Sequence, residues 1–349
     1  MLLAIQAIGV ILRPNVQPNL QLVDHLNINH EKGRHDLLTA FYCDVLGCAL
    51  DPRKEDNLEK GAGTLWCNAG ITQFHLSEGK PDAQRLDGSV TLGYASLSSV
   101  RGRLAAGPPS VLADSAFSHS EDKDGSIVLS DPWGSKFILV ERDAGAFDVR
   151  GSQPGPKSEP RGILDLTFLL PASTSPKRVA GIGRFYSKIL GCPVVRSDDK
   201  CVVLGTSGDV ATDGATPRQT LTFVVSDAAD DIAHEDLGED EEGRSLNRGA
   251  HVSVYLRDLP SAYEKADALG LCYVNHRFSR RAYTLDEAVD QCMFRMLDVV
   301  DPEDVAAGPI LRIEHEVRSC TKKDGTKYKS CPIDDETLAE FANRDIAIA

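Results

Sequence analysis

The chain has 349 residues, of which 42% are hydrophobic and 26% are charged, and its formal net charge is −14 at pH 7. This length is sufficient for two ordinary domains with hydrophobic cores, and the composition is that of a globular protein. The negative charge argues against a nucleic-acid partner, because a phosphate backbone requires a basic protein face.

Neither the cysteines nor the N-terminus point to secretion or to a membrane. The nine cysteines are scattered without a Cys-x-x-Cys pair, so we expect free thiols in a reducing compartment. The apolar segment 1–12 is too short to span a bilayer and has no basic residue before it. We therefore expect a cytoplasmic protein without membrane contact, with organellar targeting as the open alternative.

The first half of the chain contains two predicted modules, each a strand, a helix and further strands. The first module has a strand at 23–29, a helix at 36–46 that ends at Gly47, and strands near 64–68 and 72–77. The second has a strand at 89–95, a helix near 99–105, and strands at 126–129 and 136–141, the last two separated by the turn Asp131-Pro132-Trp133-Gly134.

The segment 147–161 is rich in Pro, Gly, Ser and charge, which is typical of a linker. It divides the chain into an N-terminal domain at 20–146 and a C-terminal domain at 162–318, followed by a tail at 319–349. We expect the tail to pack on the last module or to fray.

The second half repeats the arrangement. The third module has a strand at 163–170, a helix at 179–190 and strands at 194–196, 201–204 and 220–225. An acidic stretch at 227–244 follows, which we interpret as a solvated loop. The fourth module has a strand at 251–256, a helix at 261–269 and strands near 272–276, 293–299 and 310–317.

The two halves share a sequence signature. Phe-Tyr-x-x-x-Leu-Gly occurs at Phe41–Gly47 and again at Phe185–Gly191, each time at the end of a predicted helix. A repeat at this offset indicates two related domains. We therefore predict an α+β fold in which four βαβββ modules form two domains with curved mixed sheets.

These features resemble the vicinal oxygen chelate superfamily, which includes glyoxalase I, bleomycin-resistance proteins and extradiol dioxygenases. Besides the repeated signature and the Asp131-Pro132-Trp133-Gly134 turn, the resemblance rests on Asp24-His25-Leu26, Gln73-Phe74-His75-Leu76, Gly249-Ala250-His251 and Ile313-Glu314-His315-Glu316. The resemblance implies that paired modules form a cup. It also implies that metal ligands come from the first and last strands of each module, and that the metal binds two neighbouring oxygens of a small substrate.

Strand alternation places the candidate residues on polar faces. His25 and Asn27 lie opposite Leu26 and Ile28, and Gln73 and His75 lie opposite their apolar neighbours. In the second half the same alternation places Asp165, His251, Tyr255, Arg312, Glu314 and Glu316 on polar faces, and it places His315 on an apolar one.

The ligand positions of the family then fall on particular residues. In a first cup they are His25 and His75, with Ser89 and Ile138 at the two remaining positions. Glu141 could replace Ile138 only if the strand at 136–141 had a different register. In a second cup they are Asp165, His251 and Glu314, with the fourth near 221–222. Only two positions of the first cup coordinate metal well, whereas the imidazole and two carboxylates of the second suit a divalent ion such as Zn, Ni, Fe, Mn or Co. Glu314 or Glu316 is the candidate catalytic ligand or base, and Asn27, Gln73, Tyr255 and Arg312 are candidate substrate contacts.

Simpler roles and other functions remain open. His25 and His75 could be hydrogen-bonding residues of a metal-free cup, and Arg312 could form an ion pair with Glu314 or Glu316. We favour a metal-dependent lyase or isomerase, a monomer or weak homodimer, that acts on a small substrate with vicinal oxygens. The alternatives are a ligand-binding protein of the bleomycin-resistance type, an extradiol-type dioxygenase, and a degenerate scaffold. The dioxygenase is disfavoured because neither half shows a clear His, His, Glu set.

Overall fold

A computed structural model describes residues 16–79, 83–142, 157–206, 219–229, 251–342 and 345–346. Most of the expected linker and most of the acidic stretch at 227–244, including its run at 239–242, lie outside these residues. Gly249 and Ala250 of the quoted motif lie outside them as well.

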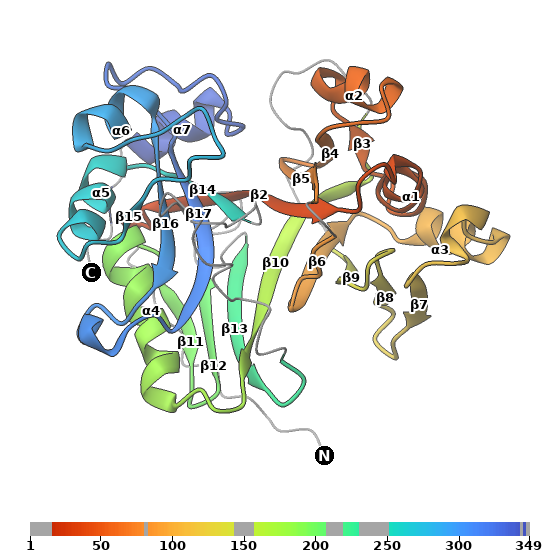
Figure 1. The fold of residues 1–349 in the computed structure, drawn as a ribbon, viewed down its shortest axis with the longest axis horizontal. Helices are drawn as coiled ribbons and strands as arrows, with labels where there is room; N and C mark the ends of the chain where they lie inside the picture. The colour runs from red at the N-terminus through yellow and green to blue at the C-terminus, as the bar shows by residue number, and fades with distance from the viewer. Residues whose placement is uncertain are drawn as a thin grey trace.

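The fold is α+β and is built on two mixed eight-stranded sheets (Figure 1). The first sheet contains, in spatial order, β15 (Cys272–Tyr273), β16 (Met293–Val299), β17 (Leu311–Ser319), β14 (His251–Leu256), β2 (Leu20–His30), β5 (Thr72–Glu78), β4 (Leu65–Ala69) and β3 (Ala49–Leu50). The second contains β11 (Val194–Ser197), β12 (Cys201–Gly205), β13 (Thr220–Ser226), β10 (Pro160–Pro171), β6 (Gly88–Tyr94), β9 (Lys136–Glu141), β8 (Ile127–Ser130) and β7 (Ser118–Glu121). Two short strands, β1 (Val16–Gln17) and β18 (Asp345–Ile346), pair separately.

Each sheet combines one module from each half of the chain. In all four modules the first strand pairs in parallel with the last one, as β2 does with β5 and β14 with β17. The two modules of a sheet then meet through their first strands, because β2 pairs antiparallel with β14 and β6 with β10.

This pairing corrects the expectation that each half of the chain forms its own cup. The first module joins the fourth, and the second joins the third. The sequence does not show whether a module pairs within its own half of the chain or with a module of the other half. In either arrangement the edge of the first strand finds a partner for its backbone groups, and all four modules have an equivalent edge.

The helices surround the sheets. They are α1 (His35–Thr39), α2 (Glu55–Glu59), α3 (Ser98–Ala106), α4 (Pro176–Leu190), α5 (Leu259–Asp267), α6 (Leu285–Gln291) and α7 (Asp335–Ala342), with short 3₁₀ turns η2 (Pro52–Lys54), η3 (Ser110–Leu112) and η4 (Val305–Ala307). Helix α1 continues as a π-helical turn, η1 (Ala40–Val45), so the helix expected at 36–46 changes its pitch midway. Helices α4, α5 and α6 lie on one flank of the molecule, and α1 and α3 lie on the other (Figure 1).

The repeated Phe-Tyr pair joins the two sheets. In the first copy the ring of Tyr42 lies 5.1 Å from that of Phe74 on β5, and the ring of Phe41 lies 5.1 Å from that of Phe137 on β9. These strands belong to different sheets, and both rings of the pair are buried. Aromatic packing of this kind adds to the apolar burial that stabilises the fold.

The second copy has the same role on the other flank. The ring of Tyr186 on α4 lies 5.5 Å from that of Phe223 on β13, and its hydroxyl lies 2.7 Å from Nε2 of His315 on β17. His315 is fully buried on the apolar side of β17, as strand alternation predicted. The signature is therefore structural, and neither tyrosine lines the cavity described below.

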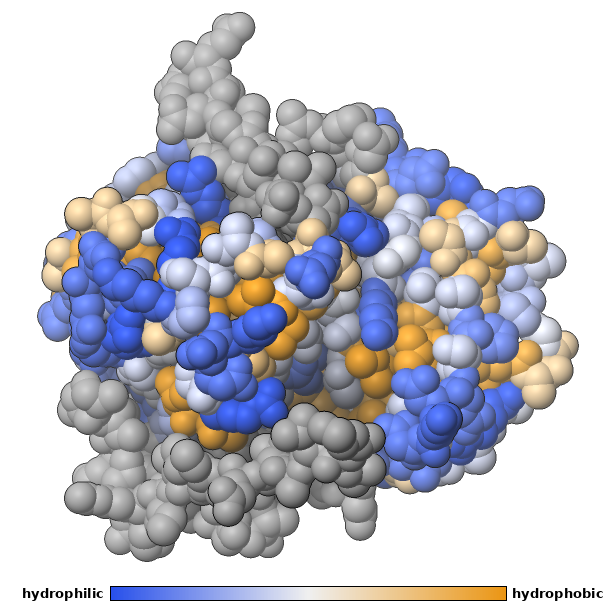
Figure 2. All heavy atoms as spheres, turned by 90° about the horizontal axis from the view of Figure 1, so that it is seen from below, coloured by the Kyte–Doolittle hydropathy of each residue, from blue (hydrophilic) through white to orange (hydrophobic). Residues whose placement is uncertain are grey.

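The remaining expectations concern the thiols and the membrane. All nine cysteines are free. None of the described helices is long and apolar enough to cross a membrane. Figure 2 shows one face of the molecule, on which hydrophobic side chains are visible on both sides of a central hollow and hydrophilic side chains border them.

Candidate metal centre

A cavity of about 520 Å³ opens on the first sheet. Its walls come from β2, β4, β5, β14, β16 and β17, and its outer part is closed by residues 278–280 and by residues 327–332 of the tail. The tail therefore packs over the cavity. Both halves of the chain contribute to the lining, because the sheet itself joins the first and fourth modules.

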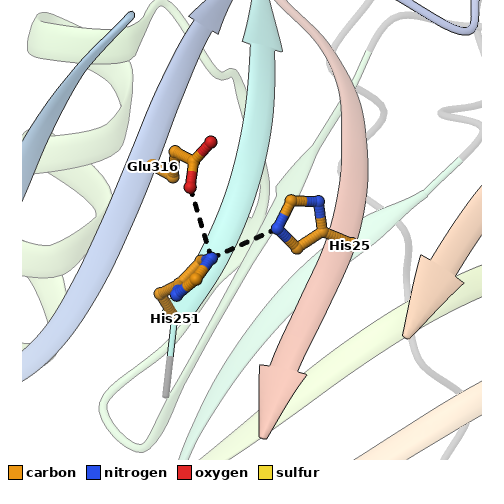
Figure 3. A group of neighbouring side chains, drawn as sticks. All are labelled: His25, His251 and Glu316. Atoms are coloured by element: carbon orange, nitrogen blue, oxygen red, sulfur yellow. Dashed lines mark hydrogen bonds and ion pairs between the residues drawn. The ribbon is translucent and has the colours of Figure 1, made fainter. Parts of the chain in front are cut away.

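Three side chains with metal-binding atoms meet at the junction of β2, β14 and β17 (Figure 3). Nε2 of His25 lies 3.2 Å from Nε2 of His251, and Nε2 of His251 lies 3.4 Å from Oε2 of Glu316. All three side chains are buried. The cross-strand pairing of β2 with β14 brings the two histidines together, and the parallel pairing of β14 with β17 brings in the glutamate.

A buried carboxylate orients His25. Nδ1–H of His25 donates a hydrogen bond of 2.7 Å to Oδ2 of Asp24, and both residues are fully buried. With its proton on Nδ1, the ring presents the lone pair of Nε2 to His251. Burial lowers the pKa of His25, although the hydrogen bond to Asp24 opposes this shift. His25 is therefore a neutral imidazole at pH 7, which is the form that binds metals.

Two arginines hold Glu316 in its ionised form. Nη2 of Arg295 lies 2.5 Å from Oε2 of Glu316, and the guanidinium of Arg318 pairs with Oε1. Burial by itself would raise the pKa of Glu316, but the charges of Arg318 and Arg295 outweigh it and hold the pKa well below its usual value. Glu316 is thus an anionic donor inside a buried site.

Glu314, the predicted ligand, has a different role. It shares a face of β17 with Glu316 and is fully buried, but its carboxylate accepts hydrogen bonds from Asn275 (2.7 Å) and from Arg295 (2.5 Å). Burial raises the pKa of Glu314, although the charge of Arg295 counters this effect. The group of three ligand atoms therefore contains the second glutamate of the motif and not the first.

Two of the three donor pairs have the spacing of ligands around one metal ion. Metal–ligand bonds of about 2.1 Å at tetrahedral or octahedral angles place neighbouring donor atoms about 3.0–3.4 Å apart. The two closest donor pairs of the group are 3.2 and 3.4 Å apart, and all three atoms lie within 4.8 Å of one another. Asp24 behind His25 is the carboxylate partner that metal-binding histidines commonly have.

His75 occupies the position in the first module that corresponds to Glu316 in the fourth. On β5 it lies opposite Asn27, two residues beyond Gln73, as Glu316 lies opposite Ser253, two residues beyond Glu314. Its ring is stacked between Trp66, with a centroid distance of 4.5 Å, and His25, at 3.6 Å. His75 therefore lies beside the three-residue group and outside its ligand set.

The tautomer of His75 is set by a chain of hydrogen bonds. The amide nitrogen of Gln73 donates to Asp51 (2.8 Å) and to Asn68, so its oxygen is left to accept the Nε2–H of His75 at 2.7 Å. Nδ1 is then the basic nitrogen of the ring.

The structure does not bring Asp165 to this site. It lies on β10 in the other sheet, where its carboxylate accepts hydrogen bonds from the hydroxyls of Thr167, Thr220 and Thr222 at 2.5–2.7 Å. Ser89 and Ile138, the other expected cup positions, are also on that sheet. The cause is the module pairing, which separates the third module from the fourth.

The four predicted substrate contacts divide into two pairs. Asn27 and Gln73 line the cavity. Tyr255 instead donates its hydroxyl to the carbonyl of Ser330 at 2.7 Å and thereby holds the tail. Arg312 pairs with Asp298 at 2.9 Å, on a half-exposed part of β17.

Sequence reasoning missed Arg295, Arg318 and the tail. A signal for Arg318 was present, because Arg312, Glu314, Glu316 and Arg318 alternate along one face of a buried strand. Opposite charges on such a face indicate an internal ion-pair network. No comparable signal marks tail residues 327–332 as part of the cavity.

A second group of possible ligand atoms consists of His30, His35 and Glu78. It lies at the ends of β2 and β5 and at the start of α1, and none of its members lines the cavity. Metal analyses of this protein therefore have to separate two potential sites.

The chain is similar to solved structures, whereas no protein-family model and no curated protein matches it by sequence. Among solved structures, the chain is similar to the CppA protein of Streptococcus pneumoniae TIGR4, with 11% identity over 86% of this chain and 99% of that one and a TM-score of 0.44.

Two further structures carry the names of enzymes. The 2,3-dioxygenase LapB of Pseudomonas sp. KL28 has 14% identity over 87% of this chain and 93% of its own, with a TM-score of 0.28. The lactoylglutathione lyase of Agrobacterium tumefaciens has 16% identity over 34% of this chain and 92% of its own, with a TM-score of 0.23. The chain itself has an α+β fold in which four modules pair to form two mixed eight-stranded sheets. Within this fold the candidate centre joins the first strand of one module to the first and last strands of its partner.

Proposed function

We propose that the protein is a metal-dependent enzyme that binds a small substrate with two neighbouring oxygens at a divalent ion held by His25, His251 and Glu316. The observation that carries this proposal is the meeting of these three buried donors at ligand-to-ligand distances, where His251 and Glu316 line the cavity. Bound there, a divalent ion would withdraw negative charge from the substrate oxygens, and an iron ion would in addition supply chemistry with dioxygen.

The surrounding residues orient the donor side chains and set their protonation states in the absence of a ligand. Asp24 fixes the tautomer of His25, and Arg295 and Arg318 keep Glu316 ionised and oriented. These contacts hold His25 and Glu316 in place, and such support of ligating side chains is the usual basis of catalytic preorganisation.

His75 is our candidate for the proton-transferring residue. It lines the cavity, stacks on a ligand histidine, and carries its proton on the nitrogen that faces Gln73. It can therefore accept a substrate proton at Nδ1. Glu314 is a poorer candidate because Arg295 and Asn275 already occupy its carboxylate. These roles favour an isomerase or lyase that moves a proton on a carbonyl-hydroxyl compound.

The first test of the proposal is whether a compound with two neighbouring oxygens binds to the protein only when a metal is present. Protein loaded separately with Fe²⁺, Mn²⁺, Co²⁺, Ni²⁺ or Zn²⁺ should change the spectrum of bound 4-nitrocatechol and leave that of 4-nitrophenol, which has a single oxygen, unchanged. The Glu316→Gln variant should lose this response. Equal binding of 4-nitrocatechol with and without metal would instead support a metal-free binding protein.

Proton transfer is tested by hydrogen exchange. Metal-loaded protein in deuterated water should catalyse exchange at the carbon-bound hydrogens of hydroxyacetone or dihydroxyacetone phosphate, followed by NMR. His75→Gln should slow the exchange by about 10²–10⁴-fold while the metal stays bound. Unchanged exchange in this variant would remove His75 from the mechanism.

The composition of the ligand group favours one second candidate, a dioxygenase that acts on an aromatic diol. Two imidazoles and one carboxylate form the facial set of non-haem iron oxygenases, and this set was missing from either half considered alone. Oxygen uptake by iron-loaded protein with substituted catechols tests this candidate. Exchange without oxygen uptake supports the isomerase or lyase, and uptake without exchange supports the dioxygenase.

A further inference from the structure

The cavity is strongly basic although the chain as a whole is acidic. Against a net charge of −14, the cavity lining contains one carboxylate, that of Glu316, and seven cationic side chains. These cations are Arg53, Lys54, Arg280, Arg295, Arg318, Lys327 and Lys329.

Four of the seven are paired with carboxylates. The inner two, Arg295 and Arg318, bind Glu316, and they also contact Glu314 and Asp24 respectively. Nearer to solvent, Arg53 pairs with Asp51 at 2.6 Å and Lys327 with Asp335 at 3.4 Å. These four charges are therefore largely balanced within the protein.

The other three cations, Lys54, Arg280 and Lys329, have no carboxylate within ion-pairing distance among the residues that the structure describes. Nζ of Lys54 lies 4.3 Å from the centre of the Trp66 ring, and the guanidinium of Arg280 lies 5.5 Å from that of Tyr328. Contact with an aromatic face positions a cation without cancelling its charge. We call these three residues the outer cation cluster.

The outer cation cluster is assembled from distant parts of the chain. Lys54 ends the η2 turn, Arg280 lies in the segment before α6, and Lys329 lies in the tail. A partly enclosed cleft focuses the field of such charges and attracts anions. Deeper in the same cavity, Oδ1 of the buried Asn27 has no hydrogen-bond donor within the described residues, so it remains able to accept one from a ligand.

We propose that the substrate carries an anionic group, a carboxylate or a phosphate, that binds the outer cation cluster while its two neighbouring oxygens face His25, His251 and Glu316. This inference rests on the proposed function and names the class of its substrate. A cavity of about 520 Å³ holds a molecule with both parts, since ordinary ligand sites span roughly 300–1,000 Å³.

Anion binding can be measured without metal, because Trp66 contacts Lys54 directly. The chain has two tryptophans, so Trp133→Phe leaves Trp66 as the only indole reporter. In this background, titration with inorganic phosphate at constant ionic strength should produce a saturable change in Trp66 fluorescence. The double change Arg280→Glu and Lys329→Glu should weaken binding at least tenfold, because two charge-assisted contacts are lost.

Lys136→Glu is the matched control, because Lys136 is exposed on β9 of the other sheet. This variant makes the same charge reversal and should leave phosphate affinity within about twofold of its starting value, since exposed charges at a distance are screened. A titration without saturation, or equal affinities in Lys136→Glu and the double variant, would overturn the inference.

Two chelating probes separate this inference from the proposed function. Catechol and 3,4-dihydroxybenzoate present the same vicinal oxygens, and only the second carries a carboxylate. Metal-loaded protein should bind 3,4-dihydroxybenzoate at least tenfold more tightly, and the advantage should disappear in the double variant. Equal affinity for both probes would contradict the anionic substrate and leave the metal centre intact. Failure of the metal to increase the affinity for either probe would contradict the proposed function itself.

Discussion

Nε2 of His25 and Nε2 of His251 lie 3.2 Å apart although 226 residues separate them in the chain. Their contact requires the antiparallel pairing of β2 with β14, in which His251 lies opposite Asn27 and His25 lies opposite Ser253. The candidate centre therefore depends on both halves of the chain and is absent from either half alone.

Asp24→Asn should weaken metal binding without removing any ligand. The carboxylate of Asp24 holds the Nδ1 proton of His25 and increases the basicity of Nε2, and the loss of such a partner typically lowers metal affinity about 10–100-fold. Competition with a chromophoric chelator measures the change. Asp165→Asn, in the other sheet, is the control that should leave affinity unaltered, and equal effects of the two variants would exclude the assigned role of Asp24.

Gly47 should tolerate alanine less well than Gly33 does. Both glycines have a left-handed backbone, with φ of 74° and 75°, so each alanine costs about 1–2 kcal/mol of unfolding free energy. At Gly47 a Cβ would also lie 2.7 Å from Cδ of Glu159, which is ion-paired with Arg103, whereas nothing lies within 4 Å at Gly33. Chemical denaturation should show a larger loss for Gly47→Ala, and Glu159→Ala should remove the difference. Equal losses in the single variants would contradict this reading.

His315 should make the fold less stable as the pH falls. Burial lowers the pKa of His315 to about 4, against an unfolded value of about 6.5. Between these two pKa values the unfolded chain binds a proton that the folded chain does not. The contribution of His315 to the free energy of unfolding is therefore complete above pH 6.5 and decreases as the pH falls towards 4. The loss amounts to at most about 3 kcal/mol. Asp131, whose burial raises its pKa to about 6, has the opposite effect on stability.

The informative quantity is therefore the difference between wild type and His315→Gln in the pH dependence of the unfolding free energy. The variant should lose less stability between pH 7 and pH 4.5 than the wild type. Parallel curves for the two proteins would show that His315 does not titrate in this way.

The tail should detach when its buried anchor is removed. Ile333 is 2% exposed and packs with Leu22, Tyr255, Tyr328 and Cys331. Ile333→Ala should cost about 2–5 kcal/mol locally and speed tryptic cleavage after Lys327 and Lys329, ahead of cleavage in the rest of the chain. Leu58→Ala, at an exposed position, should change neither property. Unchanged cleavage in Ile333→Ala would contradict a tail held by this cluster.

The sequence was sufficient for most of the strands and for the polar faces, but it did not predict the short elements β3, α2, β7 and α6. Strand alternation placed His25, His75, His251 and Glu316 on faces that do line or border the cavity, because a half-buried strand has a period of two residues. It also placed His315 correctly on an apolar face. Local patterns of this kind depend only on neighbouring residues.

The sequence was not sufficient to predict which modules pair in each sheet. All four modules have the same strand order, so nothing local shows that β14 pairs with β2 and not with β10. This choice separated Asp165 from His251, and it created a His, His, Glu set that neither half displays. The choice between Glu314 and Glu316 was likewise decided by distant residues, since Arg295 and Asn275 occupy the former.

The metal content of two matched variants tests the central claim most directly. Glu316→Gln and Glu314→Gln remove the same charge from the same face of β17, two residues apart. After reconstitution and desalting, elemental analysis should show that Glu316→Gln has lost one equivalent of divalent metal relative to wild type, whereas Glu314→Gln retains it. Using the difference from wild type excludes any ion bound at His30, His35 and Glu78. If Glu316→Gln retained as much metal as wild type, the centre formed by His25, His251 and Glu316 would be contradicted.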